Sequence, residues 1–175
     1  MKYAAFLRGI NVGGNNMIKM ETLRKALEGL GYGNVKSYVN SGNLVFDTRK
    51  TDDGKLAKAI RAAIQKEFGF DISVMVRSMD EIGKIVADNP YDGQFDNHKY
   101  FYVFFLDREL SKEEKKLLTE QANENEMITI DGRTIYYLLR ISILDSALGK
   151  GFLDRKLKIP ATGRNWRTIT TVAAM

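Results

Sequence analysis

The chain has 175 residues, of which 44% are hydrophobic and 28% charged, and its 27 basic and 22 acidic residues give a net charge of +5. This is the composition of a globular protein with one domain or two small ones. There is no cysteine and a single histidine, His98. Disulfides, thiolate metal sites and cysteine nucleophiles are therefore excluded, and we expect no metal and no cofactor.

The longest uninterrupted apolar run, at 101–106, is far shorter than the ~20 residues of a membrane-spanning helix. Only five uncharged residues lie between Lys2 and Arg8, which is too short for the core of a signal peptide. We therefore expect a cytoplasmic protein without a membrane partner. The sequence does not indicate its oligomeric state.

Residues 1–77 are predicted to form the first half of the fold. Apolar residues recur at strand or helix spacing, which predicts strands at 2–8, 35–39, 44–46 and 72–76 and helices at 20–30 and 56–68. The two middle strands are joined by the turn-rich segment 40–43 (NSGN). The order β-α-β-β-α-β is the split arrangement of ferredoxin-like domains.

A linker helix and loop are expected over 78–98, where Ser78 and Glu81 form a capping box and Pro90 ends the helix. Residues 99–175 are predicted to form the second half, with strands at 100–106, 127–130 and 135–141 and helices from 111, over 152–157 and over 165–174. A helix stands where the last strand would be. We therefore predict an α+β fold of two ferredoxin-like halves, the second with a C-terminal helix in place of its last strand.

The charge is unevenly distributed along the chain. Residues 1–50 carry a net charge of +5, residues 51–150 a net charge of −4, and residues 151–175 a net charge of +4. If the two basic ends meet in space, they form a surface suited to an anion. The alternative is a solvated surface with no partner.

The segment 9–14 (GINVGG) follows the first strand and precedes a helix. Gly9 and Gly14 have the spacing of a phosphate-binding P-loop, but Asn15 and Asn16 stand where that motif needs Lys and Ser or Thr, so a magnesium-dependent NTPase is poorly supported. Two interpretations stay open. Either the loop presents backbone N–H groups to an anion, with charge from Arg8 and Lys19, or its glycines serve a turn and its asparagines cap the helix.

The turn 40–43 and the tail 162–167 (TGRNWR) also have two interpretations. Polar groups at the turn either stabilise a hairpin or converge on a ligand. Trp166 follows helical spacing with the residues after it and is expected to anchor the last helix on the core, with base stacking as the alternative. Arg164 and Asn165 are predicted at the start of that helix, where the helix dipole disfavours a cation, which indicates an outside partner or a buried carboxylate. The aromatic strand 100–105 lacks the RNA-recognition consensus and is better explained by packing.

Three of these segments together are similar to a known family. Residues 8–14, with Met20, Leu23 and Gly31 after them, residues 38–43 and residues 162–166 resemble, in that order, bacterial proteins catalogued as domain of unknown function family 1697. The resemblance covers nearly the whole chain and implies a two-part α+β architecture with ferredoxin-like halves, but no activity. The family's last motif is usually followed by Asn-Thr, whereas Arg167 and Thr168 stand here.

We therefore predict one cleft that receives an anionic ligand, either a nucleic acid or a phosphorylated small molecule. The ligand-binding residues predicted from the sequence are Arg8, Gly9, Asn11, Gly13, Gly14, Asn15, Ser41, Asn43, Arg164 and Asn165. An alternative is an enzyme acting on a phosphorylated or anionic small molecule through Arg and Asn electrostatics, a carboxylate or a tyrosine, although the spacing identifies no catalytic residue. A third possibility is a structural or protein-interaction module in which the motifs hold the halves together, which saturated hydrogen bonds of buried asparagines would favour.

Overall fold

The computed structural model describes residues 1–175, and the chain divides into two compact units. Unit 1 comprises Met1–Ala87 and Thr170–Met175, and unit 2 comprises Asp88–Ile169. Each unit contains one four-stranded antiparallel sheet with helices. The α+β class and the two halves predicted from the sequence are confirmed.

Unit 1 has the order β-α-β-β-α-β-α. Its elements are β1 (Lys2–Leu7), α1 (Met20–Glu28), β2 (Gly33–Tyr38), β3 (Asn43–Asp47), α2 (Asp53–Phe68), β4 (Val74–Ser78) and α3 (Met79–Ala87). The strands pair in the order β2-β3-β1-β4. The central strand β1 therefore has β3 on one side and β4 on the other, and the β1–α1 loop leaves from the middle of the sheet.

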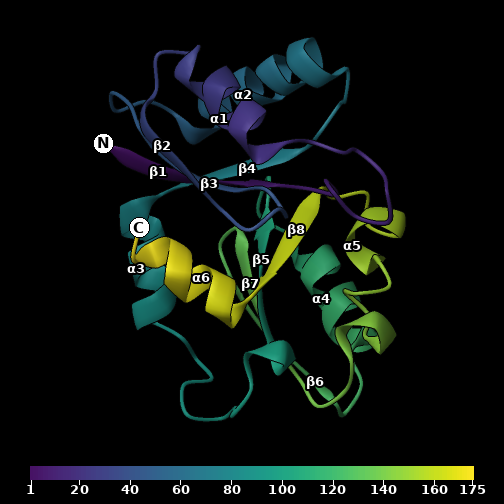
Figure 1. Cartoon of the computed structure of the whole chain (residues 1–175). Coiled ribbons are helices and arrows are strands. Elements are labelled where there is room, and N and C mark those ends of the chain that lie inside the picture. The colour runs from purple at the N-terminus through teal and green to yellow at the C-terminus, as the bar shows by residue number, and fades with distance from the viewer. The chain divides into compact units, whose positions relative to one another are not determined.

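The core of unit 1 lies between the sheet and helices α1 and α2, which share one side of it in Figure 1. Alternate residues of β1 face this core, and the buried residues of the two helices meet them: Tyr3, Ala5 and Leu7 from the strand, Leu23 and Leu27 from α1, and Leu56, Ile60 and Ile64 from α2. Helix α2 is capped at both ends. The Asp52 side chain accepts a hydrogen bond from the Lys55 N–H at 2.9 Å, and Gly69 ends the helix at φ 75°.

Unit 2 repeats the strand plan of unit 1. Its elements are η1 (His98–Tyr100), β5 (Phe101–Leu106), α4 (Lys112–Gln121), β6 (Glu126–Asp131), β7 (Thr134–Leu139), η2 (Ile143–Asp145), α5 (Phe152–Arg155) and β8 (Ala161–Asn165), and α6 (Trp166–Ala173) begins within this unit. The sheet order β6-β7-β5-β8 matches the order in unit 1, strand for strand. A core cluster on one side of this sheet includes Leu106, Leu118, Ile135, Tyr137 and Leu153.

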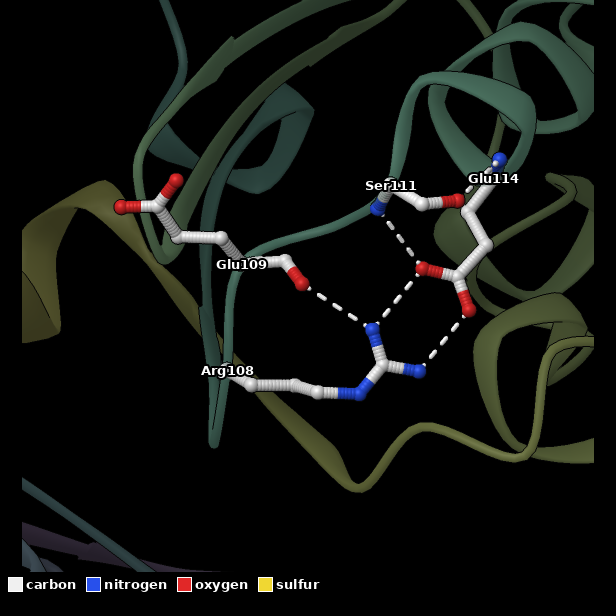
Figure 2. Close-up of polar contacts among 4 residues, drawn as sticks. All are labelled: Arg108, Glu109, Ser111 and Glu114. Atoms are coloured by element: carbon white, nitrogen blue, oxygen red, sulfur yellow. Dashed lines mark hydrogen bonds and ion pairs between the residues drawn. The ribbon is translucent and has the colours of Figure 1, made fainter.

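The predicted capping box of Ser78 and Glu81 is confirmed. Ser78 N–H donates to the Glu81 carboxylate at 2.8 Å, and Glu81 N–H donates to Ser78 Oγ at 3.2 Å. Ser111 and Glu114 make the same reciprocal pair at the start of α4, where the Arg108 guanidinium also donates two 2.8 Å bonds to the Glu114 carboxylate (Figure 2). These side chains satisfy N–H groups that the first turn of a helix leaves without partners.

The expectation that a helix replaces the last strand of unit 2 is wrong, because β8 is present and α6 follows it. The strand sequence ATGRN has no apolar alternation, so its pattern did not predict a strand. Gly163 pairs with Phe104 of β5, and a Cβ on Gly163 would lie 2.7 Å from Phe104 Cζ. The missing side chain makes room for the ring, so tertiary packing decides the structure of this segment.

Candidate functional site

The β1–α1 loop (residues 8–19) contains a tight two-residue reversal. Asn15 N–H donates to the Val12 carbonyl at 3.0 Å, and Gly13 and Gly14 lie between them with φ of 57° and 77°. A type I′ turn needs positive φ at both central positions, which glycine adopts without steric cost. The turn therefore explains this glycine pair, and all four residues of the reversal are exposed.

Asn11 fixes the base of the β1–α1 loop. Its Nδ2 donates to the carbonyls of Ile18 at 3.0 Å and Asn40 at 2.8 Å, and its Oδ1 accepts the Ile18 N–H at 2.8 Å. Asn16 adds a 3.0 Å bond from its Nδ2 to the Gly9 carbonyl. Asn16 is not among the site residues predicted from the sequence, and its bond to Gly9 is visible only in the fold.

The β2–β3 turn (residues 39–42) packs directly against this loop. Leu7 N–H donates to the Gly42 carbonyl at 2.8 Å, and a Cβ on Gly42 would lie 2.6 Å from Leu7 Cβ. Asn43 is fully buried, and its Nδ2 donates to the Tyr38 carbonyl and to Ser41 Oγ, both at 3.0 Å. The structure therefore brings the first two predicted motifs together within unit 1.

The loop and the turn carry three exposed apolar side chains. Val12, Met17 and Val39 are 63%, 62% and 51% exposed. They are the sequence neighbours of Asn11 and of its two partners, Ile18 and Asn40. Val39 also has φ 49°, a left-handed conformation that is a true outlier for a β-branched residue. Such strain costs on the order of 1–3 kcal/mol and is often found at functional sites.

The net positive charge of the protein is carried by unit 1. That unit carries 14 basic and 9 acidic residues, a net charge of +5, whereas unit 2 carries 13 of each and is neutral. Arg8 and Lys19 stand at the two ends of the β1–α1 loop. Arg8 is partly exposed and its N–H donates to the Ser73 carbonyl at 3.0 Å, while Lys19 is exposed.

The third predicted motif belongs to unit 2. Arg164 lies in β8 and not in the helix start, is 7% exposed, and donates from Nη1 to Thr162 Oγ1 at 2.7 Å and to the Gly163 carbonyl at 2.9 Å. Burial lowers the pKa of Arg164 to about 10, so the guanidinium stays charged at neutral pH. Its place in one cleft with Arg8 would join the two units and stays a prediction.

Asn165 and Trp166 are accounted for by the start of α6. The Asn165 Oδ1 accepts the Thr168 N–H at 3.0 Å, which is the bond that an N-cap residue makes. The Trp166 ring packs on Phe101, with ring centroids 4.9 Å apart, and on Phe95 at 6.3 Å. The predicted anchoring role of the tryptophan is confirmed.

The structure contains no group of three or more His, Cys, Asp or Glu side chains that could hold a metal ion. None of its helices combines the length and the apolar character needed to span a bilayer. What the site offers chemically is therefore cationic side chains, exposed backbone N–H groups and a fixed loop.

Comparison with known proteins gives a family and a fold. The family model described as "Protein of unknown function (DUF1697)" matches residues 1–136. No curated protein matches the sequence. The chain is similar to a solved structure described as the conserved bacterial protein SP0830 from Streptococcus pneumoniae, with a TM-score of 0.78 and 24% identity over 99% of this chain and 97% of the other. At that identity the likeness shows the fold alone.

Proposed function

The chain belongs to the DUF1697 family of proteins of unknown function, and from that premise we propose that it binds an anionic ligand where the β1–α1 loop meets the β2–β3 turn. A nucleic-acid strand and a phosphorylated small molecule are the two ligand classes suited to such a surface. Of these, the nucleic-acid strand has the better support.

The observation that carries the proposal is the fixed, exposed tip of the loop. Asn11 ties both ends of the loop to neighbouring backbone, so little conformational entropy remains to be lost on binding. The N–H groups of Gly13 and Gly14 are exposed and donate no hydrogen bond within the protein. Backbone N–H groups held in this way are suitable donors to phosphate oxygens.

Charge and apolar contacts favour a strand over a small molecule. The whole net charge of the protein resides in unit 1, and a polyanion gains from a broad basic surface as well as from single contacts. Val12, Met17 and Val39 are exposed beside the loop, where they offer apolar contact to bases or sugars. In this arrangement Arg8 and Lys19 neutralise phosphates, and Asn11 and Asn43 position the loop and the turn without touching the ligand.

A second candidate, a purely structural role for the motifs, is favoured by the hydrogen bonds of the asparagines. Asn11, Asn43 and Asn165 all direct their side-chain amides to partners within the protein. If this candidate is correct, the wild type binds neither RNA nor DNA at low salt. No observation on the described residues favours the enzyme alternative.

The two candidates are separated by anisotropy titrations of a labelled single-stranded RNA and the matching DNA at low and moderate salt. Arg8→Gln and Lys19→Gln are each expected to weaken binding and to reduce the slope of log K against log salt by about 0.7, the value for one phosphate contact on a single strand. Lys58→Gln, which removes an exposed charge from α2 of the same unit, is the matched control and is expected to leave both unchanged.

Arg164→Ala tests whether the third motif contributes to the same ligand. Reduced binding in this variant as well as in Arg8→Gln would show that the third motif contributes to binding. Equal loss in Lys58→Gln would mean a diffuse basic surface, and no binding at low salt would leave the structural role.

A further inference from the structure

The two units differ most in the segment that precedes their last strand. In unit 1 this segment is the regular helix α2, from Asp53 to Phe68. In unit 2 the segment 140–160 contains only the short elements η2 and α5, joined by irregular backbone. A hollow of about 310 Å³ lies beside this segment and is lined by unit 2 residues alone. That volume is at the lower end of the range for small-molecule pockets.

A buried carboxylate is among the residues that line this hollow. Glu126 is 7% exposed, and its Oε1 accepts hydrogen bonds from the Tyr137 hydroxyl and, at 2.7 Å, from the Ala147 N–H. Its Oε2 accepts the Asn123 N–H at 3.2 Å. Three donors from the protein therefore satisfy the carboxylate oxygens of Glu126, and the cations of the rim have to outweigh its charge when an anion binds.

The rim carries three exposed cations, Lys150, Arg155 and Lys156. None of their side chains makes a hydrogen bond or ion pair within the protein. Arg155 lies across Gly151, whose φ is 81°: a Cβ on that glycine would lie 3.5 Å from Arg155 Nε. The guanidinium of Arg155, the last residue of α5, thus lies at the edge of the pocket, where it bonds no group of the protein itself.

Amide groups complete the donor set. Gln121 and Asn123 both line the hollow. Asn123 Oδ1 accepts the Asn125 N–H at 2.8 Å, so the Nδ2 group of Asn123 points away from Asn125. Asp145 is the one rim carboxylate, so three cations face one exposed anion.

We infer that this pocket of unit 2 binds a small phosphorylated molecule. A phosphate group has three terminal oxygens and nearly two negative charges, which match three cations and two amide donors better than a carboxylate does. Arginine in addition bonds phosphate through two parallel N–H groups. The site is formed by unit 2 alone, so it does not depend on the nucleic-acid surface proposed for unit 1.

The test is calorimetric titration of the full chain with inorganic phosphate and with pyrophosphate, at constant ionic strength set by chloride. One saturable site is expected. Arg155→Gln and Lys150→Gln are each expected to weaken binding by roughly ten-fold or more, the effect of losing one charge-assisted contact. Lys112→Gln, an exposed cation of α4 outside the pocket, is the matched control and is expected to leave the affinity unchanged.

Several results would overturn the inference. They are no binding of either probe to the wild type, an equal loss in Lys112→Gln, and succinate binding as tightly as pyrophosphate. Binding lost in Arg8→Gln but retained in Arg155→Gln would also overturn it, because the phosphate would then occupy the unit 1 loop. Unchanged Trp166 fluorescence in each variant verifies that unit 2 is folded.

Discussion

Units 1 and 2 have the same strand order and the same βαββαβ plan, but each is elaborated at a different place. Unit 1 has a long loop after its first strand (residues 8–19), where unit 2 has only residues 107–111. Unit 2 has an irregular segment at 140–160, where unit 1 has the regular helix α2. The parts common to both units form the sheets and cores, and the parts that differ form the exposed loop of unit 1 and the pocket of unit 2.

This difference indicates where function is located. A regular helix between the third and fourth strands buries an apolar stripe, as Leu56, Ile60 and Ile64 of α2 do. A segment without such a helix cannot bury an apolar stripe in this way, and its backbone N–H and C=O groups need hydrogen-bond partners other than those of a helix. Positions where a sequence departs from local regularity are often functional or strained sites. The pocket of unit 2 and the loop of unit 1 both fit that description.

The largest expected effect concerns the close packing that joins the loop and turn of unit 1. Gly42→Ala places a Cβ 2.6 Å from Leu7 Cβ and 2.9 Å from Ile10 Cδ1, at φ 80°. The left-handed conformation costs about 1–2 kcal/mol for a residue with a Cβ, and the overlap adds about 1–3 kcal/mol. We expect a loss of about 3–4 kcal/mol in the free energy of unfolding, measured by urea denaturation followed by circular dichroism.

Gly31→Ala is the matched control for this substitution. Gly31 has φ 82° and nothing within 4 Å of an added Cβ, so it measures the conformational cost alone. We expect a loss of about 1–2 kcal/mol there. Equal losses of unfolding free energy in the two variants would show that the neighbours of Gly42 move to accommodate the added Cβ. That result would contradict a rigid junction of loop and turn.

The second prediction concerns the three hydrogen bonds by which the Asn11 side chain holds the β1–α1 loop of unit 1. Asn11→Ala removes three hydrogen bonds, leaving the carbonyls of Ile18 and Asn40 and the Ile18 N–H without that partner. These groups are partly exposed and can bond to water instead, so we expect a loss of about 2 kcal/mol in the free energy of unfolding. Nucleic-acid binding should fall as well, because the loop is no longer held.

Asn15→Ala separates positioning from contact, since Asn15 is exposed and its side chain makes no hydrogen bond within the protein. We expect its stability to be unchanged within about 0.5 kcal/mol. Weaker binding in Asn15→Ala without a loss of stability would identify a contact residue. A stability loss as large as that of Asn11→Ala would refute the claim that the hydrogen bonds of Asn11 hold the loop.

The elements with strong periodicity could be predicted from the sequence, and those fixed by tertiary contacts could not. Helix α2 and both capping boxes follow from local patterns that the fold confirms. Strand β8 was missed because its pairing with β5 and the ring of Phe104 over Gly163 determine it. Local propensity is a weak guide wherever packing of this kind decides.

The candidate sites divide in the same way. The sequence singled out the loop and turn of unit 1 because glycine and asparagine mark unusual backbone there. It gave no reason for Asn11 to contact Asn40, since that bond spans 29 positions. Arg155 and Lys156 stood out only as part of the basic segment 151–175, and Lys150 lies in the acidic segment 51–150. A pocket arises from the path of the backbone and has no periodic signal in the sequence.

The smallest expected effect is on the stability of the protein at acid pH, to which one ion pair in each unit contributes. In unit 2 the Arg108 guanidinium and the Ser111 N–H lower the pKa of Glu114 from 4.5 to about 2 (Figure 2). In unit 1 Arg61 alone bonds Asp71 and lowers its pKa from 3.8. Since each folded-state pKa lies below the unfolded value, each pair stabilises the fold above the unfolded pKa and loses that effect as the pH falls through the folded pKa.

Glu114→Gln should therefore flatten the dependence of unfolding free energy on pH between about 4.5 and 2. Asp71→Asn should flatten it less, because Asp71 lacks the backbone donor that Glu114 has. Both pairs are solvent-exposed, so the differences will be small and will shrink in high salt. An acid limb that is steeper in Glu114→Gln than in wild type would contradict the sign. Equal flattening in the two variants would show that the capping N–H of α4 adds nothing to the guanidinium, and the two units would then be alike in this respect.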